Sequence, residues 1–358
     1  MKFSICIPNF NYASYIGRTI ESILAQDQQD FEILVSDNAS TDQSLEIIHS
    51  FGDPRIRLRV NACNVGFSGN LDRAASMATG DWLNMLSSDD VMRPTALSTY
   101  QRLIDHLAES GRRAVICSSS QMIDSNDNVT GRIGLMRSIW YESDRATELD
   151  SIVGGPVYRI PAAELLRRAL IEFKNPFSFL ATIYPRPLYH EVEGYGGNRC
   201  IVPDKWFHWK LLSVADTAYF IDKPLYGYRW HPTNQAAQQS LVGSLKFIVD
   251  GYLSTLEFDE FRLQRAGLSR NDYVQAFVEN DIARHGLATL GRGERLRAKR
   301  ILQFGSAVYP EHVRRNAKAW ALSLLLLLGP AGRQFARWAY LKHQERNSVN
   351  NRVDDENN

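Results

Sequence analysis

Residues 82–90, WLNMLSSDD, decide the fold, because a short apolar run there ends on two neighbouring carboxylates. Residues 31–37, FEILVSD, also end an apolar run on an acid. Runs of this length predict buried strands, and acids that follow them mark the edge where an α/β sheet holds a charged ligand. Adjacent carboxylates repel each other unless a cation or hydrogen-bond donors compensate. The pair Asp89 and Asp90 therefore predicts a divalent metal shared with the diphosphate of a nucleotide-linked substrate.

Strand and helix patterns alternate through the first 118 residues. Five strands are predicted, at residues 3–7, 31–36, 56–60, 82–86 and 114–118. Helical patterns between them favour a mostly parallel sheet flanked by helices, an α/β fold. The carboxyl ends of such strands lie at one edge, so residues 8–11 (PNFN), Asp37, Asp89 and Asp90 are expected to meet there.

Beyond residue 118 the pattern is mixed, and from about residue 240 it is helical. Residues 180–184 predict a strand, residues 204–212 a helix, and residues 219–221 and 225–228 two short strands. The Asn-, Asp- and Glu-rich tail predicts disorder over residues 346–358. No internal repeat is visible in the sequence.

The order of several motifs closely resembles the N-terminal half of family 2 glycosyltransferases. They are residues 6–11 (CIPNFN), 32–42 (EILVSDNASTD), 64–66 (NVG), 80–82 (GDW) and 88–90 (SDD). The resemblance is strong over residues 1–118 and extends to about residue 235. It implies the GT-A fold and an inverting transfer of a sugar, usually with Mg²⁺ or Mn²⁺. Residues 1–118 would then be the nucleotide-sugar-binding half, residues 119–238 the acceptor-side half of the same catalytic domain, and residues 239–345 a helical C-terminal region.

The resemblance assigns the donor side of the site. Pro8, Phe10 and Asp37 would hold the nucleotide base, Asp89 would face the ribose and the metal, and Asp90 would be the main metal ligand. The loop at residues 64–70 follows a strand and precedes a helix, so its backbone can approach a ligand. The expected nucleotide-binding set is Pro8, Phe10, Asn11, Asp37, Asn64, Gly66, Asn70 and Asp89.

The same residues also allow structural readings. Asp37 begins a segment rich in helix-capping residues, and Asp89 and Asp90 can belong to a solvated loop. Residues 64–70 can be an ordinary strand-to-helix loop. These alternatives stay open at the level of the sequence.

The second half of the family pattern implies the remaining roles. Residues 202–207 (VPDKWF) resemble the segment that ends in the catalytic base, which makes Asp204 the candidate; its alternative is a plain helix cap. A carboxylate there can take the proton of the acceptor hydroxyl as it attacks, a contribution of ~10²–10⁴ in rate. Residues 228–232 (YRWHP) resemble a segment in which His231 reaches the metal or diphosphate and Arg229 the phosphate charge; a structural histidine is the alternative.

Three positions depart from the family pattern. Phe10 stands where tyrosine is frequent, which removes a hydroxyl contact. Ser87 replaces an acid often found two positions before Asp89. Pro203 stands where a second acid often precedes the base, so the assignment of Asp204 rests on fewer matching residues.

The C-terminal region is basic and rich in leucine. The whole chain carries a net charge of +1, but residues 292–346 contain twelve Lys or Arg and three Asp or Glu. Residues 319–328 are almost purely apolar; as a helix they span about 15 Å, against a hydrocarbon core of about 30 Å. The run is expected either to pack in a core or to dock on an anionic membrane surface. The interleaved leucines argue against nucleic acid as the partner.

Localisation is expected to be cytoplasmic, with possible peripheral attachment to the inner face of the cell membrane. The four cysteines form no C-x-x-C pair, as in a reduced cytosolic protein, and no secretory signal precedes Pro8. A sugar or a lipid-linked oligosaccharide is then the expected acceptor, as in the assembly of surface polysaccharide or glycolipid.

Three other classes of protein match the sequence less well. A sugar-phosphate nucleotidyltransferase needs a Gly-rich basic loop after its first strand, and residues 8–11 are PNFN. A dinucleotide-dependent oxidoreductase needs G-x-G-x-x-G, which the sequence lacks. A non-catalytic nucleotide-sugar-binding protein would keep Asp37 and would not need Asp204.

Overall fold

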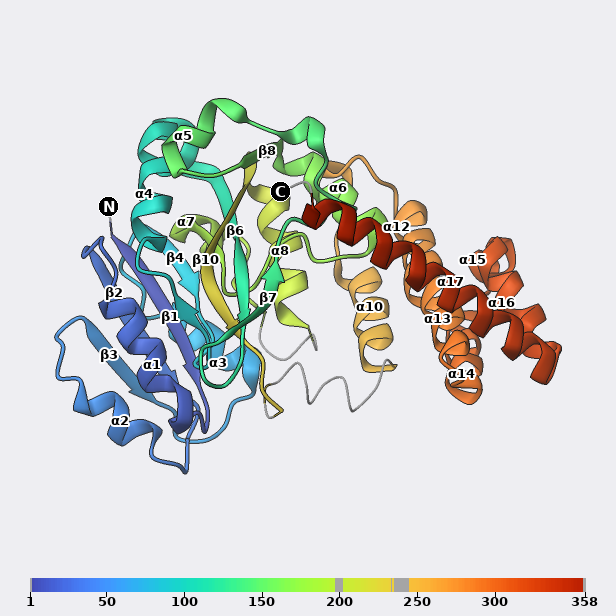
Figure 1. Ribbon diagram of the computed structural model, residues 1–358, viewed down its shortest axis with the longest axis horizontal. Helices are drawn as coiled ribbons and strands as arrows, with labels where there is room; N and C mark the ends of the chain where they lie inside the picture. Colours follow the sequence, from blue (N-terminus) through green and yellow to red (C-terminus); the bar gives the residue numbers. More distant parts are fainter. Residues whose placement is uncertain (1, 197–201, 233, 235–244, 357–358) are drawn as a thin grey trace. The chain divides into compact units, whose positions relative to one another are not determined.

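The computed structural model describes residues 2–196, 202–232, 234 and 245–356 (Figure 1). The chain divides into two compact units. The first comprises Met1–Ala169, Lys174–Gly243 and Arg265–Gly267, and the second comprises Leu170–Phe173, Ser244–Gln264 and Leu268–Asn358. Every predicted site residue lies in the first unit.

A single sheet forms the centre of the first unit. Its main path runs β3-β2-β1-β4-β9-β6-β10-β5, with β7 beside β6 and β8 beside β10. The strands are β1 (Phe3–Asn9), β2 (Phe31–Asp37), β3 (Ile56–Val60), β4 (Trp82–Met85), β5 (Val91–Met92), β6 (Ala114–Ile123), β7 (Val129–Ile133), β8 (Val157–Pro161), β9 (Thr182–Pro185) and β10 (Thr217–Arg229).

The four neighbours β3, β2, β1 and β4 are parallel, as the alternation of elements predicts. Every residue of β1, β2 and β4 is buried, which is why these strands are apolar on both faces. The register sets Asn9 opposite Asp37, so β1 and β2 end side by side. The carboxyl ends of these strands therefore form one rim.

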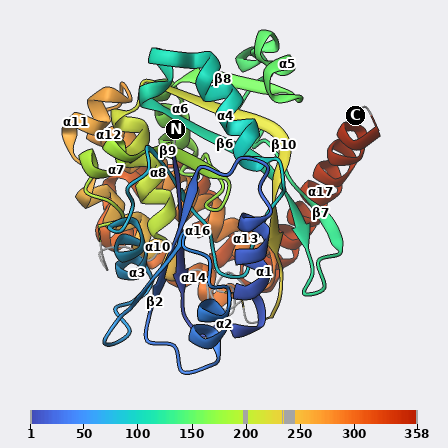
Figure 2. The same cartoon turned by 90° about the vertical axis from the view of Figure 1, so that its left-hand side faces the viewer.

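Helices cover this sheet and follow from their apolar spacing. Ile16, Ile20 and Ile23 form the buried face of α1, and α1 packs against α2 (Figure 2). The carboxylate of Asp42 accepts a hydrogen bond from the backbone N–H of Ala13 and so caps α1. The helices are α1 (Ala13–Leu24), α2 (Ser44–Ser50), α3 (Phe67–Ala75), α4 (Ala96–Leu107), α5 (Asp150–Val153), α6 (Ala162–Glu172), α7 (Arg186–Glu191) and α8 (Pro203–Val214), with short 3₁₀ turns at Ala108–Arg113, Glu142–Asp144 and Thr147–Leu149.

Two features of the sheet differ from the sequence prediction. β9 lies antiparallel between β4 and β6, so the sheet is parallel in its first half and mixed in its second. The two short strands predicted around residues 219–228 are one strand, β10, with register irregularities on both sides of Pro224. A proline cannot donate a ladder hydrogen bond, so it resembles a strand end in the sequence although the strand continues past it.

The C-terminal region is helical, as predicted. Its elements are α10 (Leu245–Glu257), α11 (Glu260–Arg265), α12 (Arg270–Phe277), a π-helical turn (Val278–Arg284), α13 (His285–Gly291), α14 (Arg295–Val308), α15 (Pro310–Arg315), α16 (Ala317–Leu327) and α17 (Gly329–Glu356). Helix α17 continues through most of the tail whose composition predicts disorder, and no Gly or Pro after Gly332 interrupts it. Among the described residues, none of the helices combines the length and the apolar character needed to span a bilayer.

Candidate functional site

The carboxylate of Asp37 lies at the end of β2 and is fully buried. Its Oδ2 accepts hydrogen bonds from the side-chain amide of Asn9, at 2.8 Å, and from the Ser40 hydroxyl, at 2.6 Å. Its Oδ1 accepts from the backbone N–H of Ser40 at 2.9 Å. Asn9 presents a buried Oδ1 that has no hydrogen-bond partner among the described residues. The pair therefore offers one unused acceptor at this part of the rim.

Asparagine side chains tie the ends of β1, β2 and β3 to α3. The amide nitrogen of Asn70 donates to the carbonyls of Asn9 and Ser36, and its Oδ1 accepts from Ser36 and Asn61. All four hydrogen-bonding positions of Asn70 are thus used within the protein. Asn70 therefore positions the rim, and the ligand contact that the sequence predicts for it stays a prediction.

The loop before α3 is held by two predicted residues. Asn64 accepts hydrogen bonds through Oδ1 from the amide of Asn38 and from the backbone N–H of Gly66. Gly66 has a φ of 81°, a conformation that favours glycine, and α3 begins at the next residue. Asn64 is exposed, so this loop lies open to solvent beside the end of β2.

The first strand ends in a buried and then an exposed segment. Pro8 is buried within β1, whereas the ring of Phe10 is 41% exposed. Asn11 is exposed, and its side-chain oxygen accepts a hydrogen bond from the backbone N–H of Thr41. Phe10 is therefore the apolar surface that this part of the rim offers to a flat ligand.

Asp89 and Asp90 lie in the turn between β4 and β5 and are both buried. The Thr19 hydroxyl of α1 donates to the carbonyls of Ser88 and Asp90, which fixes the turn. The backbone N–H of Arg229, the last residue of β10, donates to Oδ1 of Asp90 at 2.8 Å. Burial raises the pKa of Asp89, and burial together with the charge of Asp89 raises the pKa of Asp90 well above its usual range.

Arg229, which the sequence predicts as a diphosphate ligand, contacts oxygens of the protein itself in this structure. Its guanidinium is fully buried: Nε donates to the carbonyl of Asp89, Nη1 donates to the carbonyl of Asp124, and Nη2 forms an ion pair with Asp127. The ring of Tyr15 lies against its other side. Because all three nitrogens already face protein oxygens, Arg229 positions the Asp89–Asp90 turn.

His231 lies against the acidic pair, and its predicted contact with a metal or diphosphate stays a prediction. Its Nε2 lies 3.0 Å from Oδ2 of Asp89. Its ring is tilted by 32° to that of Tyr15, with centroids 4.5 Å apart, and meets that of Tyr12 edge-on at 6.0 Å. The imidazole is almost completely buried. No motif in the sequence predicts that Tyr12 or Tyr15 lies at this site.

Asp89, Asp90 and His231 fit a divalent cation in the type of their donors, since carboxylate oxygens and an imidazole suit Mn²⁺ and the oxygens suit Mg²⁺. Arg229 lies beside the buried pair: its backbone N–H donates to Asp90 and its Nε donates to the carbonyl of Asp89. Within the described parts of the chain, however, no three His, Cys, Asp or Glu side chains are already arranged around a common point for a metal.

Asp204 is the second residue of α8 and is half-buried. The amide nitrogen of Asn175 donates to its Oδ2 at 2.9 Å, and Oδ1 of Asn175 lies 2.8 Å from Nδ1 of the buried His208. Burial raises the pKa of Asp204, opposed by the backbone N–H groups of Lys205 and of Asp204 itself and by Asn175. Burial also lowers the pKa of His208 to about 3, so its imidazole is neutral and Nδ1 carries the proton that Asn175 accepts.

The structure thus gathers the predicted residues in three groups. Adjacent strand ends bring the Asp37 group and the Asp89–Asp90 group to one rim. Asp204 forms the third, linked by Asn175 to the segment that leads into β9, which starts where β4 ends. The sequence missed Asn175, because a single asparagine between motifs carries no spacing signal.

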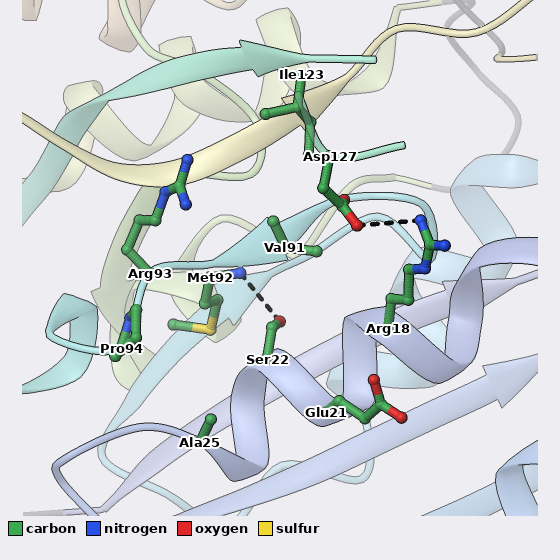
Figure 3. A pocket seen from close by; sticks show the side chains of 10 residues that line it. All are labelled: Arg18, Glu21, Ser22, Ala25, Val91, Met92, Arg93, Pro94, Ile123 and Asp127. Carbon is green, nitrogen blue, oxygen red and sulfur yellow. Dashed lines mark hydrogen bonds and ion pairs between the residues drawn. The ribbon is translucent and has the colours of Figure 1, made fainter. Parts of the chain in front are cut away.

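A hollow of about 480 Å³ lies beside this rim, between α1 and β5 (Figure 3). Arg18 and Asp127 form an ion pair across it, and the Ser22 hydroxyl accepts a hydrogen bond from the backbone N–H of Met92. None of the predicted site residues, all within the described part of the chain, lines it. Asp127 also pairs with Arg229, so the wall of the hollow is tied to the residue that holds Asp89 and Asp90.

Comparisons with known proteins give consistent matches. Residues 4–173 match the family model described as Glycosyl transferase family 2. An uncharacterized glycosyltransferase, alr2836 of Nostoc sp., is 25% identical over 359 residues, covering 97% of this chain and 92% of that protein. Other curated relatives are more similar over shorter stretches, and this chain covers between 10% and 34% of their lengths.

Solved structures agree on the fold. Staphylococcus aureus TarS 1–349 in complex with UDP-GlcNAc superposes with a TM-score of 0.63 at 18% identity, covering 97% of this chain and 92% of that one. The mannosyltransferase PcManGT from Pyrobaculum calidifontis, in complex with GDP-Man and Mn²⁺, gives 0.51 at 15% identity, covering 95% and 84%. These likenesses confirm the GT-A-type α/β fold with a helical region after it.

Proposed function

Because this chain is a glycosyltransferase whose residues 4–173 belong to glycosyl transferase family 2, we propose that it moves a sugar from a nucleotide-diphosphate sugar to an acceptor hydroxyl with inversion. The observation that carries the proposal is the shared rim: parallel strands β1, β2 and β4 end together, which places Asp37 beside Asn9 and both near the Asp89–Asp90 turn. Ligands of open α/β sheets bind outside these strand ends.

The donor nucleotide is proposed to lie over the rim. The exposed ring of Phe10 would stack on the base, and the unused Oδ1 of Asn9 beside Asp37 would accept a base N–H. Asn64 and the backbone of Gly66 are open to solvent next to these groups and would contact the base or ribose. The nucleotide complexes of TarS and PcManGT support a donor of this class.

Asp90, with Asp89 and His231, is proposed to hold Mg²⁺ or Mn²⁺ facing the donor diphosphate. A cation bound there supplies positive charge opposite the departing nucleotide. The donor set on these three residues and the Mn²⁺ in the PcManGT complex support this assignment. Arg229 would keep the turn in place through its contacts with Asp89 and Asp90.

Asp204 is proposed as the general base. The acceptor oxygen forms a bond to the anomeric carbon as its proton passes to the Asp204 carboxylate, and the bond to the diphosphate oxygen breaks with its electron pair. The raised pKa of Asp204 suits proton transfer better than that of an ordinary carboxylate. Asn175 would aim the carboxylate through its hydrogen bond.

The acceptor is proposed to be a sugar or a lipid-linked oligosaccharide, with the protein acting at the inner face of the cell membrane in polysaccharide or glycolipid assembly. The matches to polysaccharide enzymes and the basic, leucine-rich C-terminal helices support this. The donor class can be found by a thermal-shift screen of nucleoside diphosphates with and without Mn²⁺, because a ligand of the folded state raises Tm.

Replacing Asp204 with Asn tests the mechanism. Transfer should fall by about 100-fold or more, while the thermal shift with the donor nucleotide is kept. Asp105, an acid on α4 outside the rim, offers a matched control: D105N should retain both activity and binding. Wild-type turnover in D204N would remove this carboxylate from the mechanism.

A further inference from the structure

Two consecutive helices of the C-terminal unit, α16 and α17, expose large apolar side chains. On α16, Trp320 is 67% and Leu327 is 81% exposed, and these are accompanied at helical spacing by further apolar residues. On α17, aromatic residues lie at a spacing of three. The exposed apolar set, called here the α16–α17 face, is Trp320, Leu324, Leu327, Leu328, Phe335, Trp338 and Leu341.

The opposite sides of the two helices are packed, so the exposed side chains are not left over from a missing core. Leu322, Leu326 and Ala336 lie in a buried cluster with Leu290 and Ala298. The backbones approach so closely that a Cβ on Gly332 would overlap the carbonyl of Leu325. Helix α16 is thus apolar on both its buried and its exposed side, which is unusual for a helix facing water.

The cations around this face outnumber the acids, although Arg314 and Arg315 pair with Glu311 and Lys318 pairs with Glu279. Residues 312–344 contain six Lys or Arg and no Asp or Glu. Arg333 and Arg337 on α17 are exposed and form no ion pair with any residue that the structure describes. Lys342 lies over the ring of Trp338 at 5.0 Å, and Phe335 stacks beside that ring at 5.7 Å. Aromatic and cationic groups are therefore interleaved on α17.

We propose that the α16–α17 face docks on an anionic phospholipid surface, with its leucines and aromatic rings in the acyl boundary and its arginines and lysines among the headgroups. Interleaved apolar and basic residues are what such an interface needs, since each cation near the surface and each buried apolar group adds to binding. A second copy of this chain would bring the same cations against Arg333 and Arg337, which form no ion pair within the described part of the chain, so charge complementarity favours the lipid. Membrane docking would bring the enzyme to a lipid-linked acceptor. In that one respect the inference rests on the proposed function.

The test uses the full chain and vesicles of phosphatidylcholine with or without phosphatidylglycerol, measured by co-sedimentation. Wild type should bind the mixed vesicles and lose binding as salt rises. R333Q/R337Q should weaken partition into them by about 30-fold. L324S/L327S and F335S/W338S should each weaken it by about tenfold or more. L296S, which changes a 72% exposed leucine on α14, is the matched control and should bind like wild type.

The following outcomes would overturn the proposal that the α16–α17 face docks on lipid. Failure of wild type to bind the anionic vesicles overturns the proposal, as does unchanged binding of the three α16–α17 variants. Concentration-dependent self-association that L324S/L327S abolishes would assign the face to a second copy and also overturn it. Thermal shifts with nucleotide are recorded on the same samples. If wild type shows the shift but no vesicle binding, only the docking proposal fails. If wild type shows no shift, the proposed transferase function fails. Thermal unfolding of every variant confirms that it is folded.

Discussion

Buried acids lie at both ends of the parallel strands: Glu32 at the amino end, and Asp89 and Asp90 at the carboxyl end. Their pKa values are shifted in opposite directions. Glu32, near the start of β2, accepts hydrogen bonds from Ser4, from Thr79 and from Lys2. Burial alone would raise its pKa, but these donors together lower it to about 2. At the other edge, burial raises the pKa of Asp89 and raises that of Asp90 well above its usual range.

The two ends of the strands differ in the number of hydrogen-bond donors that surround each carboxylate. Around Glu32 the donors exceed what one carboxylate needs, and the cations of Lys2 and Arg57 add to them. At the rim, two adjacent carboxylates share a turn whose nearby cation, Arg229, meets mainly backbone oxygens. A buried acid with enough donors stabilises the fold, whereas the pair with fewer donors is where we propose that a cation binds.

The largest effect should come from removing the rim charge. D90N should lower transfer by about 100- to 1000-fold without lowering Tm, because it removes repulsion between buried acids. Wild type treated with a chelator should lose activity and regain it on addition of Mn²⁺ or Mg²⁺, and D90N should gain little from either ion. Transfer assays with and without metal check this. If both proteins responded equally to metal, Asp90 would not be a ligand of the cation.

A smaller effect should come from Asp204, which accepts a hydrogen bond from Asn175. N175A removes a hydrogen bond that favours the charged form of Asp204. The pKa of Asp204 should therefore rise further, and the acidic limb of kcat/KM should move to higher pH, with a loss of about tenfold at low pH.

The pH profile separates positioning from a structural role. Loss of packing alone would lower kcat/KM equally at every pH, which would contradict the role given to Asn175. H208Q keeps the amide of Asn175 and serves as the milder comparison, with a smaller displacement of the limb.

The smallest effect on activity should come from the opposite edge. E32Q should leave transfer within about twofold and lower the free energy of unfolding by about 2 kcal/mol, the size of a charged hydrogen bond. Because the folded pKa of Glu32 is depressed, its stabilisation is present above its ordinary pKa of 4.5 and is lost as pH falls through about 2. Denaturant unfolding should thus show the two proteins converging in acid. A constant difference across that range would show that packing, not charge, holds this edge.

The sequence predicts the rim well because its information is local. The apolar runs before Asp37 and Asp89 specify parallel strands, and parallel strands must end at a common edge. The motif around residues 228–232 places His231 at the same rim, where its Nε2 lies 3.0 Å from Oδ2 of Asp89.

Other features follow from contacts that no local pattern encodes. Asn70 and Arg229 lie in motif segments that predict ligand contacts, yet the folded chain surrounds them with its own carbonyls. The antiparallel entry of β9 between β4 and β6 likewise needs the whole sheet. Burial and partner number decide these roles, and both are properties of the packed state.

By itself, the sequence determined the α/β order of the first unit, the helical nature of the second and the acids that end the strands, because periodicity and turn residues act over a few neighbouring positions. Only the tertiary structure decided which of those polar groups keep an unused atom, that Asn175 reaches Asp204 across 29 residues, and that leucines of α16 point outward as well as inward. The reason is physical: solvent access and hydrogen-bond supply depend on every segment that packs nearby, however distant it is along the chain.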